Sequence, residues 1–181
     1  MGLLTLVQQQ SIKPISNNWA VTVKNTGGLS NFLQVESEVE ENELRDLLGV
    51  ALLQDIQDNP TDANNVLLLD GSTFEDCNGN TVKTKGLRYV IAYMVHSQEV
   101  FESKIADTFS GYVNKNRQET TDLNQGQTKT LQARSRELAL TEFELIRQYL
   151  DENSTTYPLW ICGISKKPYT PKIIGVKKTY R

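Results

Sequence analysis

The middle of the chain reads Gly86-Leu87-Arg88-Tyr89-Val90-Ile91-Ala92-Tyr93-Met94-Val95, and this stretch decides the class of fold. Apolar residues recur at helical spacing from Leu87 to Phe101, which predicts a helix over about residues 86–103. Tyr89, Ala92, Tyr93 and Val95 widen the apolar stripe. A helix that is apolar on most sides is expected at the centre of a core. The sequence therefore predicts a mainly α fold built around this helix.

Two further amphipathic helices are predicted, one on each side of the central helix in the sequence. The upstream one is a continuous helix of about four turns, with start signals at Ser37 and Asn42 and a stop at Asn59-Pro60. The downstream one covers roughly residues 131–153 and repeats Ala139, Phe143, Ile146 and Leu150 on one face. The upstream stripe consists of Leu44, Leu47, Leu48, Ala51, Leu52 and Ile56. The expected architecture is a small bundle of three amphipathic helices.

The remaining segments are expected to be irregular or extended. Residues 1–35 are interpreted as an extended N-terminal arm, with one short strand at 19–23 where β-branched residues alternate. Residues 60–85 are interpreted as a linker with a helical turn at 66–69 and an Asn78-Gly79 hairpin. The expected organisation is an N-terminal arm (1–35), a helical domain (36–160) containing a long inter-helix loop at 107–129, and a basic C-terminal arm (161–181).

Charge is distributed unevenly along the 181 residues, although the formal net charge is only −3. That net charge argues against a general binder of polyanions. Residues 36–58 carry eight acidic residues and Arg45 alone, whereas residues 166–181 carry six basic residues and no acidic one. Opposite charge at two ends suits head-to-tail docking of like subunits. The alternative is two solvated surfaces that have no relation to each other.

The sequence offers no catalytic or cofactor-binding pattern, and we expect a protein that is not an enzyme. Gly27-Gly28 lacks the spacing of a phosphate-binding loop, and the single His96 has no nucleophile near it in sequence. Glu99 and Glu102 are expected to form a solvated helix face. The two cysteines, Cys77 and Cys162, lie outside any metal-ligand or disulfide pattern. No cofactor and no metal site are therefore expected.

No signal peptide and no membrane-spanning segment are predicted. The apolar residues 3–7 lack a basic region before them and run directly into Gln8-Gln9-Gln10. Nowhere does the chain contain an apolar run of 18 residues. We expect synthesis and use in a cytoplasm, with no membrane partner.

The basic C-terminal arm leaves two kinds of partner open. Its lysines and arginine, together with Tyr169 and Tyr180, suit a segment that follows phosphates and stacks on bases. Its prolines and the alternating Ile173-Ile174-Gly175-Val176 instead suit a strand that adds to the edge of a neighbour's sheet. The protein partner is the favoured interpretation.

An ordered series of short motifs resembles a group of small proteins from phages and prophages of Bacteroidetes, and it spans roughly residues 36–160. Those proteins are similar to the head–tail connector (adaptor) subunits of tailed phages. The motifs are Glu43-Leu44-Arg45-Asp46-Leu47-Leu48-Gly49, Leu68-Leu69-Asp70-Gly71-Ser72-Thr73-Phe74-Glu75, Gly86-Leu87-Arg88-Tyr89-Val90-Ile91-Ala92-Tyr93, Asp107-Thr108-Phe109-Ser110-Gly111-Tyr112-Val113 and Tyr157-Pro158-Leu159-Trp160. The chain departs from that plan by its longer N-terminal arm and its basic tail, which leaves the tier of the connector open.

The resemblance implies a structural virion protein at the head–tail junction, made in the host cytoplasm. Such subunits form a ring, commonly of twelve copies, that docks under the portal protein and meets tail or neck proteins, with genomic DNA in the lumen. A tail-completion or terminator protein is a close alternative, and a DNA-binding protein that uses the basic arm is a second. We expect the partner interface in the mid-chain loop and the C-terminal arm, although Trp160 is equally suited to closing the subunit's own core. The expected interface residues are Phe109, Tyr112, Val113, Trp160, Lys166, Lys167, Tyr169, Lys172, Ile173, Lys177, Lys178 and Arg181.

Overall fold

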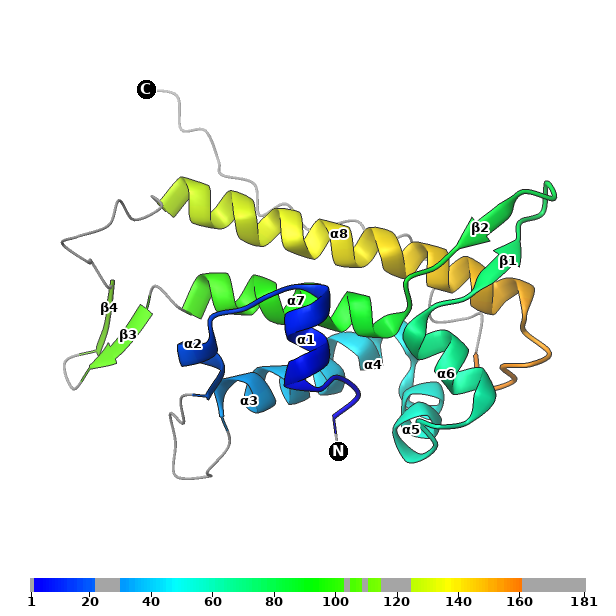
Figure 1. Cartoon of the computed structure of the whole chain (residues 1–181), viewed down its shortest axis with the longest axis horizontal. Coiled ribbons are helices and arrows are strands. Elements are labelled where there is room, and N and C mark those ends of the chain that lie inside the picture. The colour runs from blue at the N-terminus through cyan, green and yellow to red at the C-terminus, as the bar shows by residue number, and fades with distance from the viewer. Residues whose placement is uncertain (1, 22–29, 103–104, 109–110, 115–124, 161–181) are drawn as a thin grey trace, which may run out of the picture.

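The computed structural model describes residues 2–21, 30–102, 105–108, 111–114 and 125–160, and it confirms a mainly α fold. Figure 1 shows two long helices side by side, with shorter helices packed against one of them and a small hairpin at each end. The elements are α1 (Leu6–Ile12), α2 (Asn17–Val21), α3 (Asn31–Glu38), the π-helix η1 (Val39–Leu44), α4 (Arg45–Leu48), α5 (Val50–Asp58), α6 (Ala63–Asp70), β1 (Thr73–Glu75), β2 (Thr81–Lys83), α7 (Leu87–Glu102), β3 (Ile105–Thr108), β4 (Gly111–Asn114) and α8 (Gln125–Glu152).

Helix α7 lies at the centre of the fold, as its apolar sequence predicts. Ten of its sixteen residues are buried. It packs antiparallel to α8 along most of its length (Figure 1) and also contacts α1, α3, η1 and α6. Polar contacts fix the register of the α7–α8 pair: His96 Nδ1 lies 3.0 Å from Ser135 Oγ, and the Ser97 hydroxyl donates to the Gln132 carbonyl. The buried residues of α7 therefore face α8 on one side and the shorter helices on the other.

The expectation of an extended arm over residues 1–35 is wrong for the described part of that range. Residues 6–12, 17–21 and 31–35 are helical, and Trp19 and Ala20, expected in a strand, lie in α2. Seven apolar residues of the range join the main core: Leu3, Leu4, Ile15, Trp19, Ala20, Phe32 and Val35. These helices are too short for an apolar period to be visible. One signal was present, because Thr5 and Gln8 form a capping box at the start of α1.

The continuous helix predicted through Leu44 and Ile56 is broken at Gly49. The backbone of Gly49 has φ = 81°, a conformation that ends α4, and α5 begins at the next residue. The helical stretch also begins earlier than expected, at Asn31, where the Ser30 hydroxyl caps the helix by accepting from Leu33 N. It passes through η1, whose wider turn accommodates the change from α3 to α4. The predicted stop at Asn59 is confirmed.

The predicted Asn-Gly hairpin is present. Strands β1 and β2 pair antiparallel with Phe74 opposite Val82, and Gly79 in the turn has φ = 79°. The Asp76 carboxylate stabilises the turn by accepting from the backbone N–H groups of Asn78 and Asn80. Helix α6 is longer than the single turn expected before it.

The long polar connection between the two main helices is shorter and more structured than expected. Strands β3 and β4 form an antiparallel hairpin with Ile105 opposite Asn114, and α8 begins at Gln125 rather than near Leu131. The first turns of α8 are rich in Gln and Thr and mostly exposed, so no apolar stripe marks them in the sequence.

Two glycines allow the chain to pass close to itself where α6, β1 and α7 meet. Gly71 ends α6 with φ = 99°, and Gly86 precedes α7 with φ = 84°. A Cβ on Gly86 would overlap the Leu69 carbonyl oxygen and would lie 2.5 Å from Gly71 N, both of them backbone atoms. Neither atom is able to move away without moving the α6–β1 turn.

We predict that Gly86→Ala destabilises the protein much more than Gly79→Ala. Both glycines have positive φ, which costs an alanine about 1–2 kcal/mol, but a Cβ on Gly79 meets nothing within 4 Å. The backbone overlap at Gly86 adds a further cost of about 1–3 kcal/mol. Urea denaturation of both variants checks this, and equal free energies of unfolding would contradict the close approach at Gly86.

Candidate functional site

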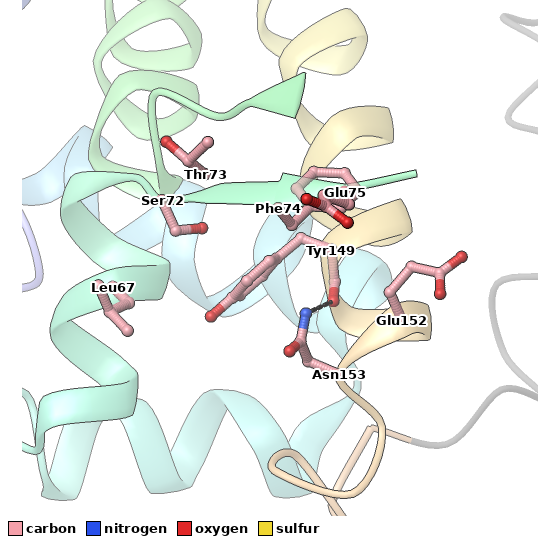
Figure 2. A pocket seen from close by; sticks show the side chains of 8 residues that line it. All are labelled: Leu67, Ser72, Thr73, Phe74, Glu75, Tyr149, Glu152 and Asn153. Atoms are coloured by element: carbon pink, nitrogen blue, oxygen red, sulfur yellow. Dashed lines mark hydrogen bonds between the residues drawn. The ribbon is translucent and has the colours of Figure 1, made fainter. Parts of the chain in front are cut away.

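A pocket of about 420 Å³ opens at the corner where α6, β1 and the last turns of α8 meet. We call it the corner pocket. Figure 2 shows the side chains of Leu67 from α6, Phe74 from β1 and Tyr149 from α8 around it. The lining residues are Leu67, Ser72, Thr73, Phe74, Glu75, Tyr149, Glu152 and Asn153.

The floor of the corner pocket is aromatic and rigid. Phe74 and Tyr149 meet edge to face with ring centroids 5.7 Å apart, and Tyr149 meets Tyr157 in the same way at 5.7 Å. The Tyr157 hydroxyl donates to the Asn64 carbonyl (2.8 Å) and lies 3.2 Å from the Tyr149 hydroxyl. Burial, followed by the neighbouring Tyr149, raises the pKa of Tyr157 well above its usual range, so this tyrosine stays neutral.

The rim of the pocket is polar, and part of it is already satisfied. The Asn153 side chain donates to the Tyr149 carbonyl (2.9 Å, dashed in Figure 2). The Ser72 backbone N–H donates to the Thr84 hydroxyl at 2.9 Å. Glu75 and Glu152, by contrast, are exposed, and within the described part of the chain neither carboxylate has an ion-pair partner. The pocket therefore combines an apolar floor with two available negative charges.

Among the lining residues, no nucleophile is paired with a base. The Ser72 hydroxyl contacts the Thr84 hydroxyl at 3.3 Å and has no histidine or lysine beside it among the lining residues. In the described ranges no three His, Cys, Asp or Glu side chains gather in a way that could hold a metal ion. An apolar floor with a few polar groups at the rim is a common lining of binding pockets.

Comparison with known proteins gives one match. Residues 44–170 match the profile of a family of unknown function, DUF6712, over more than half of the chain. The chain belongs to this family. No curated protein and no solved structure matches it.

The DUF6712 range includes the whole corner pocket and both long helices, and it begins at the last residue of η1. Three of the motif stretches lie at or beside the pocket, and one of them, residues 68–75, contributes to its lining. Residues 68–75 form the end of α6 and β1, Gly86 touches the α6–β1 turn, and Tyr157 packs behind Tyr149. The pocket is thus the place where segments distant in the sequence of this DUF6712 chain come together.

The interface residues predicted from the sequence fall in different places. Trp160 is buried, with 6% of its surface exposed, and its Nε1 donates to Asp151 Oδ1 at 2.7 Å, so it closes the chain's own core. Tyr112 and Val113 lie on β4, whose side chains are not described. Nine predicted residues lie outside the described residues: Phe109, Lys166, Lys167, Tyr169, Lys172, Ile173, Lys177, Lys178 and Arg181.

The acidic run at 36–58 does not form one solvated surface. Glu36 and Glu40 are buried, and Glu43 forms an ion pair with Arg136 at 2.7 Å. Glu38, Glu41, Asp46 and Asp58 are exposed. The linear run of acidic residues conceals this separation, because carboxylates that are close in sequence point to different sides of a helix.

His96 and Glu99, two ionisable residues of α7, make structural contacts. Burial, followed by the charge of Lys13, lowers the pKa of His96 to about 4, so the ring is neutral against Ser135. Glu99 was expected on a solvated face, but it is buried and accepts from Ser16 N at 3.3 Å. Burial raises the pKa of this carboxyl. Both residues join α7 to a neighbouring segment.

The buried pair Glu36 and Glu40 attaches the N-terminal segment to the helical body. Glu36 Oε1 accepts from Leu4 N at 3.0 Å, and Glu40 accepts from Leu3 N at 2.5 Å and from the Gln57 side chain at 2.9 Å. Burial, then the hydrogen bond and charge of Glu40, raise the pKa of Glu36 to about 8, against a smaller lowering by the Leu4 N–H. Glu36 therefore holds a proton at neutral pH.

We predict that Glu36→Gln removes a pH dependence of stability. The pKa of Glu36 is higher in the folded chain (about 8) than in an unfolded one (4.5), so the folded state keeps a proton that the unfolded state releases. Stability from this group is complete below pH 4.5 and falls by about 1.4 kcal/mol per pH unit between the two values. The glutamine mimics the protonated acid and flattens that slope.

Thermal or urea unfolding from pH 5 to 8 measures this difference. Glu137→Gln, at an exposed position on α8, serves as the control and leaves the slope unchanged. Parallel curves for the natural chain and Glu36→Gln would show that the Glu36 carboxyl is already ionised in the folded state.

Proposed function

We propose that this chain is a structural subunit of the head–tail connector of a tailed phage. In this proposal, copies of the chain form a ring, with twelve as the expected number, that docks under the portal and receives tail or neck proteins. The chain would then reside in the virion at the head–tail junction.

The observation that carries the assembly part of the proposal is the division of charge within one chain. Of its 19 basic residues, six lie in 161–181; none of its 22 acidic residues does. Residues 1–160 therefore carry 13 basic and 22 acidic residues, a formal charge of −9. The C-terminal arm, residues 161–181, which we also call the basic tail of the chain, carries +6. Copies that carry both charges attract one another head to tail, and a heterologous contact repeated around an axis closes a ring.

The helical body supports the same proposal. Its long α7–α8 pair supplies a rigid frame, and the β1–β2 and β3–β4 hairpins extend from opposite ends of that frame (Figure 1). A ring subunit needs such a frame together with segments that reach its neighbours. The placement at the head–tail junction rests on the motif resemblance.

DNA binding by the basic tail is the main alternative. The net charge of −9 on residues 1–160 repels phosphate, so contact with DNA would be restricted to residues 161–181. None of the helices in the described ranges is long and apolar enough to cross a membrane.

We predict that removing residues 166–181 leaves the body folded and abolishes assembly. The described residues already form one hydrophobic core that includes Trp160, so we expect the shortened chain to fold. Circular dichroism tests the fold, and native mass spectrometry with purified portal protein tests ring formation. A full-length variant with all six basic residues of 166–181 changed to Gln separates charge from length and is also expected to fail.

Assembly of the shortened chain at the natural level would contradict the docking role of the tail. A gel shift with duplex DNA that persists at moderate salt and disappears with the tail would favour the DNA-binding alternative. A cryo-electron microscopy map of the virion with no density for this chain at the neck would end the connector proposal.

A further inference from the structure

Strand β1 leaves one edge open beside the corner pocket. Thr84 N donates to the Ser72 carbonyl at 2.8 Å and Asp76 N donates to the Asn80 carbonyl at 2.9 Å, so the even-numbered residues of β1 bond to β2. Thr73 and Glu75 therefore direct their backbone N–H and C=O groups away from β2. Among the described residues, no backbone or side-chain group is bonded to these four groups.

An open edge is a template for another strand, and the corner pocket lies against it. Thr73, Phe74 and Glu75 belong both to the edge and to the pocket lining (Figure 2). A strand added here would place alternate side chains over the apolar floor formed by Leu67, Phe74 and Tyr149. The Glu152 carboxylate is then available to a cationic side chain on the pocket face of the incoming strand. Glu75 lies on the opposite face of β1 from Phe74, so it is available to a cationic side chain on the other face.

Residues 172–178 have the side-chain pattern that such a site requires. In an extended segment, alternate residues share a face, and Lys172, Ile174, Val176 and Lys178 fall on one face. That face presents two β-branched apolar residues between two lysines. The pocket offers the complement, an apolar floor with the Glu152 carboxylate at its rim.

The position of Trp160 favours a neighbouring copy as the source of this strand. Trp160 is bonded to Asp151, and at 100° per residue Asp151 lies on the side of α8 opposite Tyr149 and Asn153, which line the pocket. The Trp160 side chain thus lies against the side of α8 that faces away from the chain's own pocket. The eleven residues 161–171 can span up to about 36 Å, enough to reach an adjacent subunit.

We propose that residues 172–178 of one copy add as a strand to β1 of a second copy, with Ile174 and Val176 over the corner pocket, a lysine of the same face against Glu152, and Lys177 of the other face beside Glu75. This inference rests on the proposed function and names the contact that would join ring subunits. The contact is heterologous, because each copy supplies a tail to one neighbour and a pocket to the other.

The first experiment measures binding of the tail to the pocket without any portal or particle. A fluorescein-labelled peptide of residues 161–181 is titrated with the full-length chain carrying Ile174→Asp and Val176→Asp, whose own tail is disabled. We expect saturable binding in fluorescence anisotropy. Adding Glu152→Lys to the protein is expected to weaken binding at least tenfold, because it reverses a charge at the rim.

Two matched controls test which site on the protein and which face of the peptide strand make the contact. Glu137→Lys reverses an exposed charge elsewhere on α8 and is expected to change binding less than twofold. A peptide with Ile173→Asp, altered on the opposite face of the strand, is expected to bind nearly as well as the natural one, whereas Ile174→Asp abolishes binding. Absence of binding, or equal effects of Glu137→Lys and Glu152→Lys, would refute the site.

The second experiment compares the natural chain with a complementary pair of variants, to decide whether the arm of the same copy or of another copy fills the pocket. A tail variant (Ile174→Asp with Val176→Asp) and a pocket variant (Glu75→Lys with Glu152→Lys), both full length, are mixed at ten times the peptide's dissociation constant. We expect each to be monomeric alone and the mixture to form a one-to-one dimer, near twice 20.4 kDa by light scattering. A mixture that stays monomeric would refute the contact between copies. A natural chain that stays monomeric at the same concentration, while the mixture dimerises, would mean that the C-terminal arm folds onto its own body.

These results are separable from those on the proposed function. Failure in either experiment leaves the connector proposal to be judged by the neck density in the virion. A dimer in the mixture, together with a virion map that lacks density for this chain at the neck, would support the docking contact and contradict the connector proposal.

Discussion

The rest of the structure depends on the burial of α7 on opposite sides at once. Helix α8 covers one side along most of its length, and α1, α3 and η1 cover another. Ile91, Val90 and Val95 are completely buried between them. Burying side chains of this size contributes roughly 1.5–3 kcal/mol each, so the helix organises the body around itself. The two hairpins and the corner pocket take their positions from the α7–α8 pair.

Buried polar groups determine which segments cover α7. Gln9 donates to the Ala92 carbonyl, Glu99 accepts from Ser16 N, and the Arg88 side chain donates to the Leu3 carbonyl. Each of these bonds joins the N-terminal segment to α7, and the Glu36–Glu40 pair joins the same segment to α3 and η1. An unsatisfied buried donor or acceptor is costly, so these contacts select one arrangement of short helices that hydrophobic burial alone would leave loosely specified.

Charge and an open strand edge together give the proposed assembly its direction. Residues 1–160 are acidic and residues 161–181 are basic, which attracts the basic segment to an acidic surface but specifies no register. The backbone groups of Thr73 and Glu75 at the open edge, and the aromatic floor beside them, supply geometry that charge lacks. Natural proteins usually keep exposed edge strands short. Strand β1 has three residues, a length that allows pairing with one short strand.

The sequence by itself determined the helical class, the central position of α7, the Asn78-Gly79 hairpin and the opposite charges of body and tail, because each depends on local period, turn chemistry or composition. Only the tertiary structure decided that Leu3, Trp19 and Phe32 belong to the core, that Gly49 divides the predicted helix, and that Glu36 and Glu99 are buried. Helices of five to eight residues carry too little period to be recognised. The corner pocket was equally invisible, because Leu67, Phe74 and Tyr149 become neighbours only when α6, β1 and α8 pack together.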